Sequence, residues 1–186
     1  MANALFFGYG SLVNAATHGF SGCRPARLDG WRRVWVPTGL RTRAFLSAEP
    51  ANGAIDGLVT AVPEGERAAL DAREQAYTQH RVQVCLTGTG RETTVRLYAV
   101  PARHRIAPLP RHHLALSYID VVVQGFLDIY GETGARRFFS TTAGWDLPVV
   151  DDRQAPHYAR HRPLRPWQRA FVDAGLAALG VTIRRP

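Results

Sequence analysis

The residues best suited to chemistry lie at two places in the first half of the chain. One is the turn Gly8-Tyr9-Gly10-Ser11-Leu12, and the other is the carboxylate of Glu74. Glycines on both sides of Tyr9 allow a sharp turn and a close approach by a ligand. Successive backbone N–H groups in such a turn can hold an anion. The turn is therefore a candidate binding site, although many Gly-X-Gly turns only redirect the chain.

Familiar phosphate and nucleophile motifs do not fit this turn. The third glycine of a dinucleotide fingerprint is missing at the required spacing, and no Gly-Lys-Ser/Thr follows as in a P-loop. Ser11 also lacks the following glycine of a nucleophile elbow. The backbone amides remain the groups of interest.

Glu74 lies at the end of a predicted helix that begins near Glu64. Leu70 and Glu74 are four residues apart and share a helix face, which Tyr77 continues beyond the helix end. Partial desolvation there would raise the pKa of Glu74 above about 4.3, as a general base requires. The alternative is an ordinary helix-end residue paired with Arg73 or Arg81.

Strands and one helix must position these groups. Apolar runs and alternation predict strands in the first half, with Gly57 marking a bulge or close approach and Pro37 ending the second strand. The pattern changes to helices after Pro101. Strands first and helices later indicate an α+β fold. We expect the strands to close into a small barrel, which the pattern alone does not establish. The predicted strands are Leu5–Tyr9, Arg33–Val36, Ile55–Val62 and a hairpin of Arg81–Leu86 with Thr93–Val100; the predicted helices are Glu64 to about Arg73 or Glu74, Leu114–Tyr130, Thr133–Ser140 and Pro166–Leu179.

The 186 residues are consistent with one domain. We expect a core over about 1–142 and a C-terminal belt and helix over about 143–186. The irregular stretch Trp145–Pro166 is interpreted as a belt that fastens the last helix, in preference to a flap over a site.

Composition is that of a globular protein outside the membrane. No apolar run approaches the roughly 20 residues of a membrane span, and the first residues do not resemble a signal peptide. The two cysteines, Cys23 and Cys85, are too few for a disulfide framework. We therefore expect a cytoplasmic protein.

The net charge of +8 invites a nucleic-acid interpretation, which the distribution of charge does not favour. All 23 basic residues are arginines, and they are spread along the chain rather than clustered with aromatic residues. We expect no specific nucleic-acid binding. No metal site is expected either, because His112 and His113 lack a third ligand at metal spacing.

Three short motifs in order resemble the γ-glutamylcyclotransferase-like family. They are the turn Phe7–Leu12, the helix end Leu70-Asp71-Ala72-Arg73-Glu74, and Ser117-Tyr118-Ile119-Asp120 at the head of a helix that contains Gly125. Leu12 stands where one branch of the family has asparagine. The resemblance covers about Leu5 to Tyr130.

The resemblance implies a small mixed β-barrel flanked by helices, with Glu74 as the acid/base. Tyr9, Gly10, Ser11 and Leu12 would bind the γ-glutamyl moiety, and Tyr118 would help to position it. The implied reaction is attack of the substrate's own α-amine on its side-chain carbonyl, which releases 5-oxoproline and an amine, amino acid or peptide. Such a reaction needs no metal or organic cofactor. Apart from the resemblance, charge and position on the glycine-flanked loop after Trp35 indicate Arg41 or Arg43 as a residue that would attract an anionic peptide.

The alternative hypothesis is a non-catalytic module that binds a small molecule on the same fold. Ligand-induced thermal stabilisation without product formation would distinguish it from an enzyme. The oligomeric state has no signal in the sequence.

Overall fold

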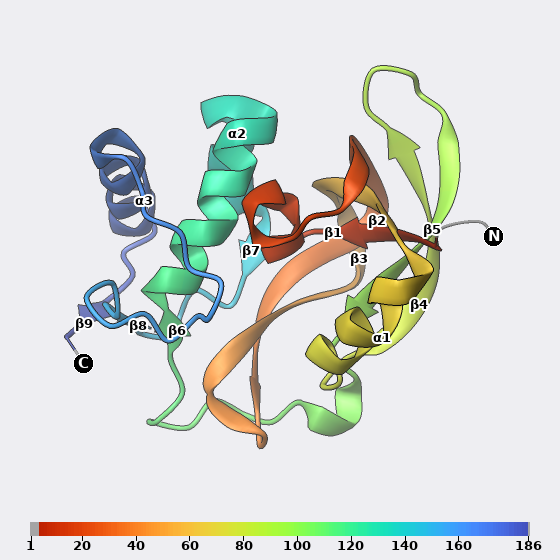
Figure 1. Cartoon of the computed structure of the whole chain (residues 1–186). Helices are drawn as coiled ribbons and strands as arrows, with labels where there is room; N and C mark the ends of the chain where they lie inside the picture. Colours follow the sequence, from red (N-terminus) through yellow and green to blue (C-terminus); the bar gives the residue numbers. More distant parts are fainter. Residues whose placement is uncertain (1–3, 186) are drawn as a thin grey trace.

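The computed structural model describes residues 4–185, which form a barrel with the two C-terminal helices together on one side (Figure 1). Five strands, one helix next to the barrel and two helices in the C-terminal part account for most of the chain. The main elements are β1 (Ala4–Gly8), β2 (Ser21–Thr38), β3 (Arg41–Val62), α1 (Glu64–Arg73), β4 (Thr78–Leu86), β5 (Glu92–Ala99), α2 (Leu116–Thr141) and α3 (Pro166–Ala178). Short strands and 3-10 turns complete them: β6 (Leu114–Ala115), β7 (Thr142–Ala143), β8 (Val149–Val150), β9 (Ile183–Arg184), η1 (Ser11–Val13), η2 (Ala15–Thr17) and η3 (Ala102–His104).

The five long strands form a closed mixed barrel, as the sequence predicts. Their order is β3-β1-β5-β4-β2, and pairing of β2 with β3 closes the ring. The β1–β5 contact is parallel and the other barrel pairings are antiparallel. The short strand β7 extends the sheet by pairing with β2. Closure leaves no free edge in the ring itself.

The strands β2 and β3 are far longer than their sequence patterns indicate. Only Arg33–Val36 and Ile55–Val62 are predicted as strands here, yet the strands run for 18 and 22 residues. The part of β2 before Arg33 is largely exposed, whereas β3 has a second buried stretch at Ala44–Ala48. The added parts contain Pro25 and Pro50, which ordinarily argue against a strand. Pro37 does not end β2 either. Pairing of β2 with β3, with register shifts along it, extends both strands beyond the predicted segments.

Helix α1 is short, and one buried residue packs it against the barrel. Leu70 is its buried side chain and packs against Phe6 and Val62. Acidic residues occupy the first turn, where the helix dipole favours them. The helix ends at Arg73, and Glu74 follows in a non-helical conformation as its C-cap.

The C-terminal part is built on α2, whose first half is almost wholly buried. Two helices are predicted here, Leu114–Tyr130 and Thr133–Ser140, and the structure has one span interrupted at Gly131, where φ is 63°. Helix α3 packs beside α2, and Gly180 follows it in the left-handed region with φ 67°. Within residues 4–185, no helix is long and apolar enough to cross a membrane.

The segment between α2 and α3 fastens these helices together. Arg153 donates two hydrogen bonds of 2.7 Å to the carboxylate of Asp120 on α2 and one of 2.7 Å to Asp173 on α3. This is the role that the belt interpretation predicts. Residues Tyr158 and Arg160 of the same segment also line a pocket, which that interpretation does not include.

Gly57 should be required for closure of the barrel beside the end of β1. A β-carbon at this position would lie 2.4 Å from the Gly8 carbonyl oxygen and 2.4 Å from the ring of Phe7. We expect Gly57→Ala to lower the free energy of unfolding by about 1–3 kcal/mol, because backbone is the obstacle. Urea denaturation measures the change. Gly53→Ala on the same strand is the control, since its nearest neighbour would be 3.9 Å away; equal stability of the two variants would contradict the argument.

Candidate active site

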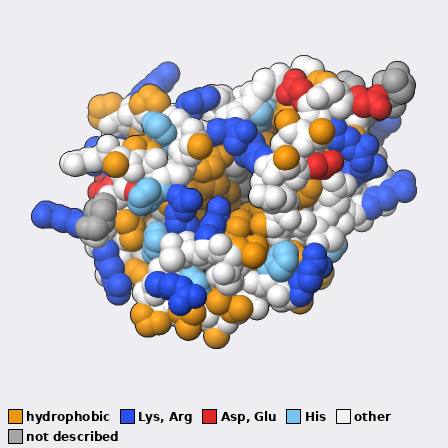
Figure 2. Space-filling view, turned by 60° about the horizontal axis from the view of Figure 1, so that its bottom comes forward, with side chains coloured by type: hydrophobic (Ala, Val, Ile, Leu, Met, Phe, Trp, Pro, Cys, Tyr) orange, Lys and Arg blue, Asp and Glu red, His pale blue; other side chains and the backbone are white. Residues whose placement is uncertain are grey.

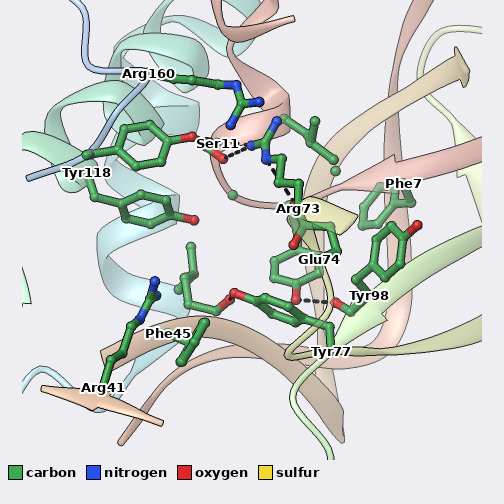
Figure 3. A pocket seen from close by; sticks show the side chains of 16 residues that line it. Phe7, Ser11, Arg41, Phe45, Arg73, Glu74, Tyr77, Tyr98, Tyr118 and Arg160 are labelled. Atoms are coloured by element: carbon green, nitrogen blue, oxygen red, sulfur yellow. Dashed lines mark hydrogen bonds and ion pairs between the residues drawn. The ribbon is translucent and has the colours of Figure 1, made fainter. Parts of the chain in front are cut away.

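A pocket of about 170 Å³ lies where four segments meet: the turn after β1, the end of α1, the first turn of α2 and the belt. Figure 3 shows Glu74, Tyr118, Arg41 and Arg160 around a common space. The lining residues are Phe7, Gly8, Tyr9, Gly10, Ser11, Leu12, Arg41, Phe45, Leu46, Arg73, Glu74, Tyr77, Tyr98, Tyr118, Tyr158 and Arg160. Every site residue predicted from the sequence therefore borders one cavity.

The turn after β1 presents backbone rather than side chains to the pocket. Pairing of β1 ends at Gly8, and the 3-10 turn Ser11–Val13 begins directly afterwards. The N–H of Val13 makes the first hydrogen bond of this turn, to the Gly10 carbonyl at 2.9 Å. The amides of Ser11 and Leu12 precede that bond, and so they have no partner within the turn.

Gly10 leaves room for the side chain of Tyr118. A β-carbon on Gly10 would lie 2.9 Å from the Tyr118 hydroxyl and 3.2 Å from Leu46. The turn and the start of α2 thus meet at van der Waals distance. A side chain at this position would enter the pocket.

Arg73 joins the two halves of the site, as the dashed contacts in Figure 3 show. Its Nε lies 3.1 Å from the Glu74 carboxylate, and its Nη2 donates to the Ser11 hydroxyl at 2.8 Å. The same Nη2 donates to the hydroxyl of Tyr158 at 3.3 Å. The ion pair with Arg73 that the ordinary helix-end interpretation predicts is therefore present, but within the pocket.

Burial raises the pKa of Glu74, as its position at the end of the apolar helix face predicts. The side chain is only 14 % exposed. The charges of Arg73, Arg160 and Arg41 act in the opposite direction and keep the shift from growing. Among residues 4–185, Glu74 is the one carboxylate that lines the pocket.

The tyrosines of the pocket are neutral donors or acceptors. Burial raises the pKa of Tyr9, Tyr77 and Tyr118, and the nearby Glu74 charge adds to each shift. The Tyr9 hydroxyl donates to the carbonyl of Tyr98 at 2.5 Å, and the Tyr77 hydroxyl donates to Leu46 at 3.2 Å. The hydroxyls of Tyr9 and Tyr77 are thus held by backbone carbonyls of the barrel.

The belt reaches the pocket because Asp152 anchors it to the start of α2. The buried Asp152 carboxylate accepts hydrogen bonds from the Ser117 amide at 2.7 Å and the Ser117 hydroxyl at 2.6 Å. It also accepts from the amide of His157 at 2.8 Å. The ring of Tyr158 then packs edge-on against Tyr118, with centroids 4.9 Å apart.

A comparison with models of known protein families identifies the family of this chain. The sequence model for "Gamma-glutamyl cyclotransferase, AIG2-like" matches residues 6–115, which include the turn, α1 and Glu74. The chain belongs to this family. Its members act on small γ-glutamyl substrates, and membership places the chain among γ-glutamylcyclotransferase-like enzymes. A comparison with curated protein sequences finds no significant match.

Solved structures share the fold at low identity. An uncharacterized protein from Homo sapiens aligns with a TM-score of 0.63 and 15% identity, over 93% of this chain and 99% of that one. A structure named gamma-glutamyl cyclotransferase aligns with a TM-score of 0.60 and 14% identity, over 92% and 99%. YkqA from Bacillus subtilis aligns with 0.60 and 18% identity, over 76% of this chain and 56% of its own.

Several pocket residues have little or no signal in the sequence. For Arg73, the sequence shows only that it precedes Glu74 in the helix-end motif and could pair with it. Arg41 was expected from its charge and loop position. Tyr158 and Arg160 come from an irregular segment outside the residues that match the family.

His112 lies in the interior of the protein, in the segment before α2. It is buried, its Nδ1 accepts from the Leu109 amide at 2.9 Å, and its Nε2 lies 3.2 Å from the Thr38 carbonyl oxygen. Its role in the structure is to connect the segment before α2 to the barrel.

Removing Arg73 should raise the pKa of Glu74 further. The guanidinium favours the ionised carboxylate, and burial alone would remain in Arg73→Met. Titration of isotope-labelled glutamate carboxyls by NMR measures the shift. Arg67→Met is the control, since Arg67 lies on the same helix beside Asp71. A Glu74 pKa that is unchanged or lower in Arg73→Met would contradict this electrostatic account.

Proposed function

We propose that this protein cyclises γ-glutamyl compounds, releasing 5-oxoproline and the amine that was linked to the γ-carbonyl. The observation that carries the proposal is Glu74, a buried carboxylate of raised pKa that faces a turn of free backbone amides across one pocket. Membership of the γ-glutamyl cyclotransferase, AIG2-like family supports the same reaction class.

The substrate supplies its own nucleophile in this reaction. Its α-ammonium loses a proton to Glu74, and the amine nitrogen forms a bond to the γ-carbonyl carbon. Glu74 gives this proton to the leaving nitrogen as the bond from the γ-carbonyl carbon to that nitrogen breaks. The ring nitrogen then loses its second proton to the released amine, so the products are 5-oxoproline and an ammonium. Because the attack is intramolecular, the pocket mainly has to hold the bent conformer of the substrate.

The raised pKa of Glu74 serves the proton transfer. A carboxylate at its ordinary value is several units too acidic to accept a proton from an ammonium, and each unit costs about 1.4 kcal/mol. Burial brings the pKa of Glu74 closer to that of the ammonium, while the charge of Arg73 favours the ionised carboxylate. The amides of Gly10, Ser11 and Leu12 would hold the substrate carboxylate or the oxyanion that develops on the γ-carbonyl. Tyr9 and Tyr118 would shape the space around the γ-glutamyl group.

The hydroxyl of Ser11 is not needed as a nucleophile. It accepts a hydrogen bond from Arg73, which ties the turn to the end of α1. This supports a role for Ser11 through its backbone amide, with the side chain fixing the position of the turn.

A second cavity of about 70 Å³ adjoins the first and would take the leaving group. It shares Arg41, Tyr77, Tyr118 and Tyr158 with the main pocket and adds Arg43, His157 and Trp35, among others. Figure 2 shows arginine side chains around a hollow on one face of the molecule.

Two features of this region favour a leaving group with a carboxylate. Among residues 4–185, none of Arg41, Arg43 and Arg160 lies within 4.0 Å of an acidic side chain, whereas other arginines form such pairs. The buried indole N–H of Trp35 also has no acceptor among residues 4–185. An anionic acceptor would satisfy both the cations and the donor, and this favours γ-glutamyl amino acids or peptides over γ-glutamyl alkylamines.

Glu74→Gln should lower kcat for 5-oxoproline formation by about a hundredfold or more, because no other carboxylate of the described pocket can move the proton. A panel of γ-glutamyl amino acids, peptides and amines, assayed for 5-oxoproline, provides the measurement. Glu66→Gln, exposed on the same helix, is the control. Undiminished turnover by Glu74→Gln would remove Glu74 from this role, and binding of the panel without any product would favour a binding module.

Arg160→Gln should raise KM for γ-glutamylalanine by about two- to fivefold, the range of an exposed ion pair. γ-Glutamylethylamide has the same γ-glutamyl group without the carboxylate, and its KM should not change. Steady-state kinetics on both substrates measure the difference. Arg162→Gln is the control, because that exposed side chain donates to the Ala16 carbonyl instead. Equal effects of Arg160→Gln on both substrates would contradict selection of the carboxylate.

A further inference from the structure

Arg33 is a fully buried cation between the barrel wall and α2. Its side chain is among the largest that are wholly enclosed, with 1% of the residue exposed. Each of its three nitrogens donates a hydrogen bond: Nε to the Tyr9 carbonyl at 3.0 Å, Nη1 to the Thr141 hydroxyl at 3.0 Å, and Nη2 to the Asp56 carbonyl at 2.8 Å. One of these acceptors belongs to the turn that borders the pocket.

No acidic side chain among residues 4–185 lies within 4.0 Å of the Arg33 guanidinium. The Asp56 carboxylate pairs with Arg27 and Arg137 instead, and only the Asp56 backbone carbonyl reaches Arg33. The rings of Phe126 and Phe138 lie 4.9 and 5.3 Å from the guanidinium carbon.

Burial lowers the pKa of Arg33 to about 10, so the group is still charged at neutral pH. A buried charge without an ionic partner is costly for the fold. Its positive potential also extends to the neighbouring turn, because the surroundings screen it weakly.

The Tyr9–Gly10 peptide unit has no strand ladder to orient it, because β1 pairing stops at Gly8. In a trans peptide the C=O and the following N–H point in opposite directions. The Tyr9 C=O points to Arg33, so the Gly10 N–H points away from Arg33. Both residues border the pocket, and in the described chain the Gly10 N–H has no acceptor.

We propose that Arg33 is a positioning residue: its hydrogen bond to the Tyr9 carbonyl turns the Gly10 N–H toward the substrate, and its charge strengthens that donor. This rests on the proposed function, since the donor would serve the γ-carbonyl oxygen or the carboxylate of a γ-glutamyl compound. A hydrogen bond to the carbonyl end of a peptide polarises its N–H end. A preoriented donor helps most where negative charge develops in the transition state.

A purely structural role makes a different prediction. In that case Arg33 would only tie the barrel to α2, through Thr141 and Asp56, and its loss would act through stability alone. Thr141→Val separates the two roles, because it removes one of the three hydrogen bonds and leaves the bond to Tyr9 intact.

The kinetic test compares wild type, Arg33→Lys and Thr141→Val. Lysine keeps the charge, but its single ammonium cannot reproduce the guanidinium fork. We expect Arg33→Lys to lower kcat for 5-oxoproline formation by about tenfold or more with little change in KM, and Thr141→Val to keep wild-type kcat. Wild-type kcat in Arg33→Lys, or an equal loss of kcat in both variants, would overturn the proposal.

A spectroscopic test covers variants that fold poorly or a protein without turnover. In wild type with isotope-labelled glycine, titration with 5-oxoproline should shift the Gly10 amide resonance more than those of glycines outside the pocket. Base-catalysed hydrogen exchange of the Gly10 amide should slow in Arg33→Lys and not in Thr141→Val, because the N–H is less acidic once the Tyr9 carbonyl loses its hydrogen bond to Arg33. If wild type forms no product from any γ-glutamyl compound, the proposed function fails, and the exchange rates alone then decide the role of Arg33. The proposal is overturned if 5-oxoproline does not shift the Gly10 amide resonance in a wild type that is active. It is also overturned if Arg33→Lys leaves the exchange rate of the Gly10 amide unchanged, whether or not the wild type is active.

Discussion

Residues Leu58–Val62 of β3 are paired along both edges, and both halves of the site depend on this segment. On one edge they pair with all five residues of β1, and on the other with the start of β2. The end of β1 delivers the turn with its amides, while the end of β3 leads through Pro63 directly into α1 and Glu74. The same ladder therefore sets the distance between the turn after β1 and the carboxylate of Glu74. Gly57 continues the segment at the point where a side chain would strike the Gly8 carbonyl.

Electrostatics then decide what the carboxylate can do. Glu74 is buried enough for its pKa to rise, yet Arg73 lies beside it and favours the charged form. Burial makes the group a stronger base, and the arginine favours its ionised form. Arg73 also holds the Ser11 hydroxyl, so one guanidinium adjusts the base and fixes the turn opposite to it. Because Arg73 contacts both Glu74 and Ser11, this ion pair at a helix end lies in the pocket and not on the surface.

Local patterns predicted the parts of the fold that local chemistry determines. The apolar run before Gly8, the helix from Glu64 and the raised pKa of Glu74 follow from residues within a few positions of one another. The full lengths of β2 and β3 could not be predicted, because they depend on the pairing of the two strands with each other, which no local pattern shows. Arg33 was assigned only to a strand. Its burial arises from contacts with Tyr9 and Thr141, which are 24 and 108 residues away in the sequence.

The residues that line the pocket come mainly from two parts of the chain, one inside the family match and one in the belt. The turn and Glu74 lie within the residues that match the family, whereas Tyr158 and Arg160 lie beyond them. Asp152 links the two parts, because it accepts the Ser117 amide at the start of α2 and the His157 amide within the belt. A change in the belt can therefore alter the surroundings of the leaving group while β1, β3 and α1 keep the amides and the carboxylate in place. In the function proposed for this protein, the specificity for the released amine and the machinery for cyclisation are thus carried by different segments of the chain.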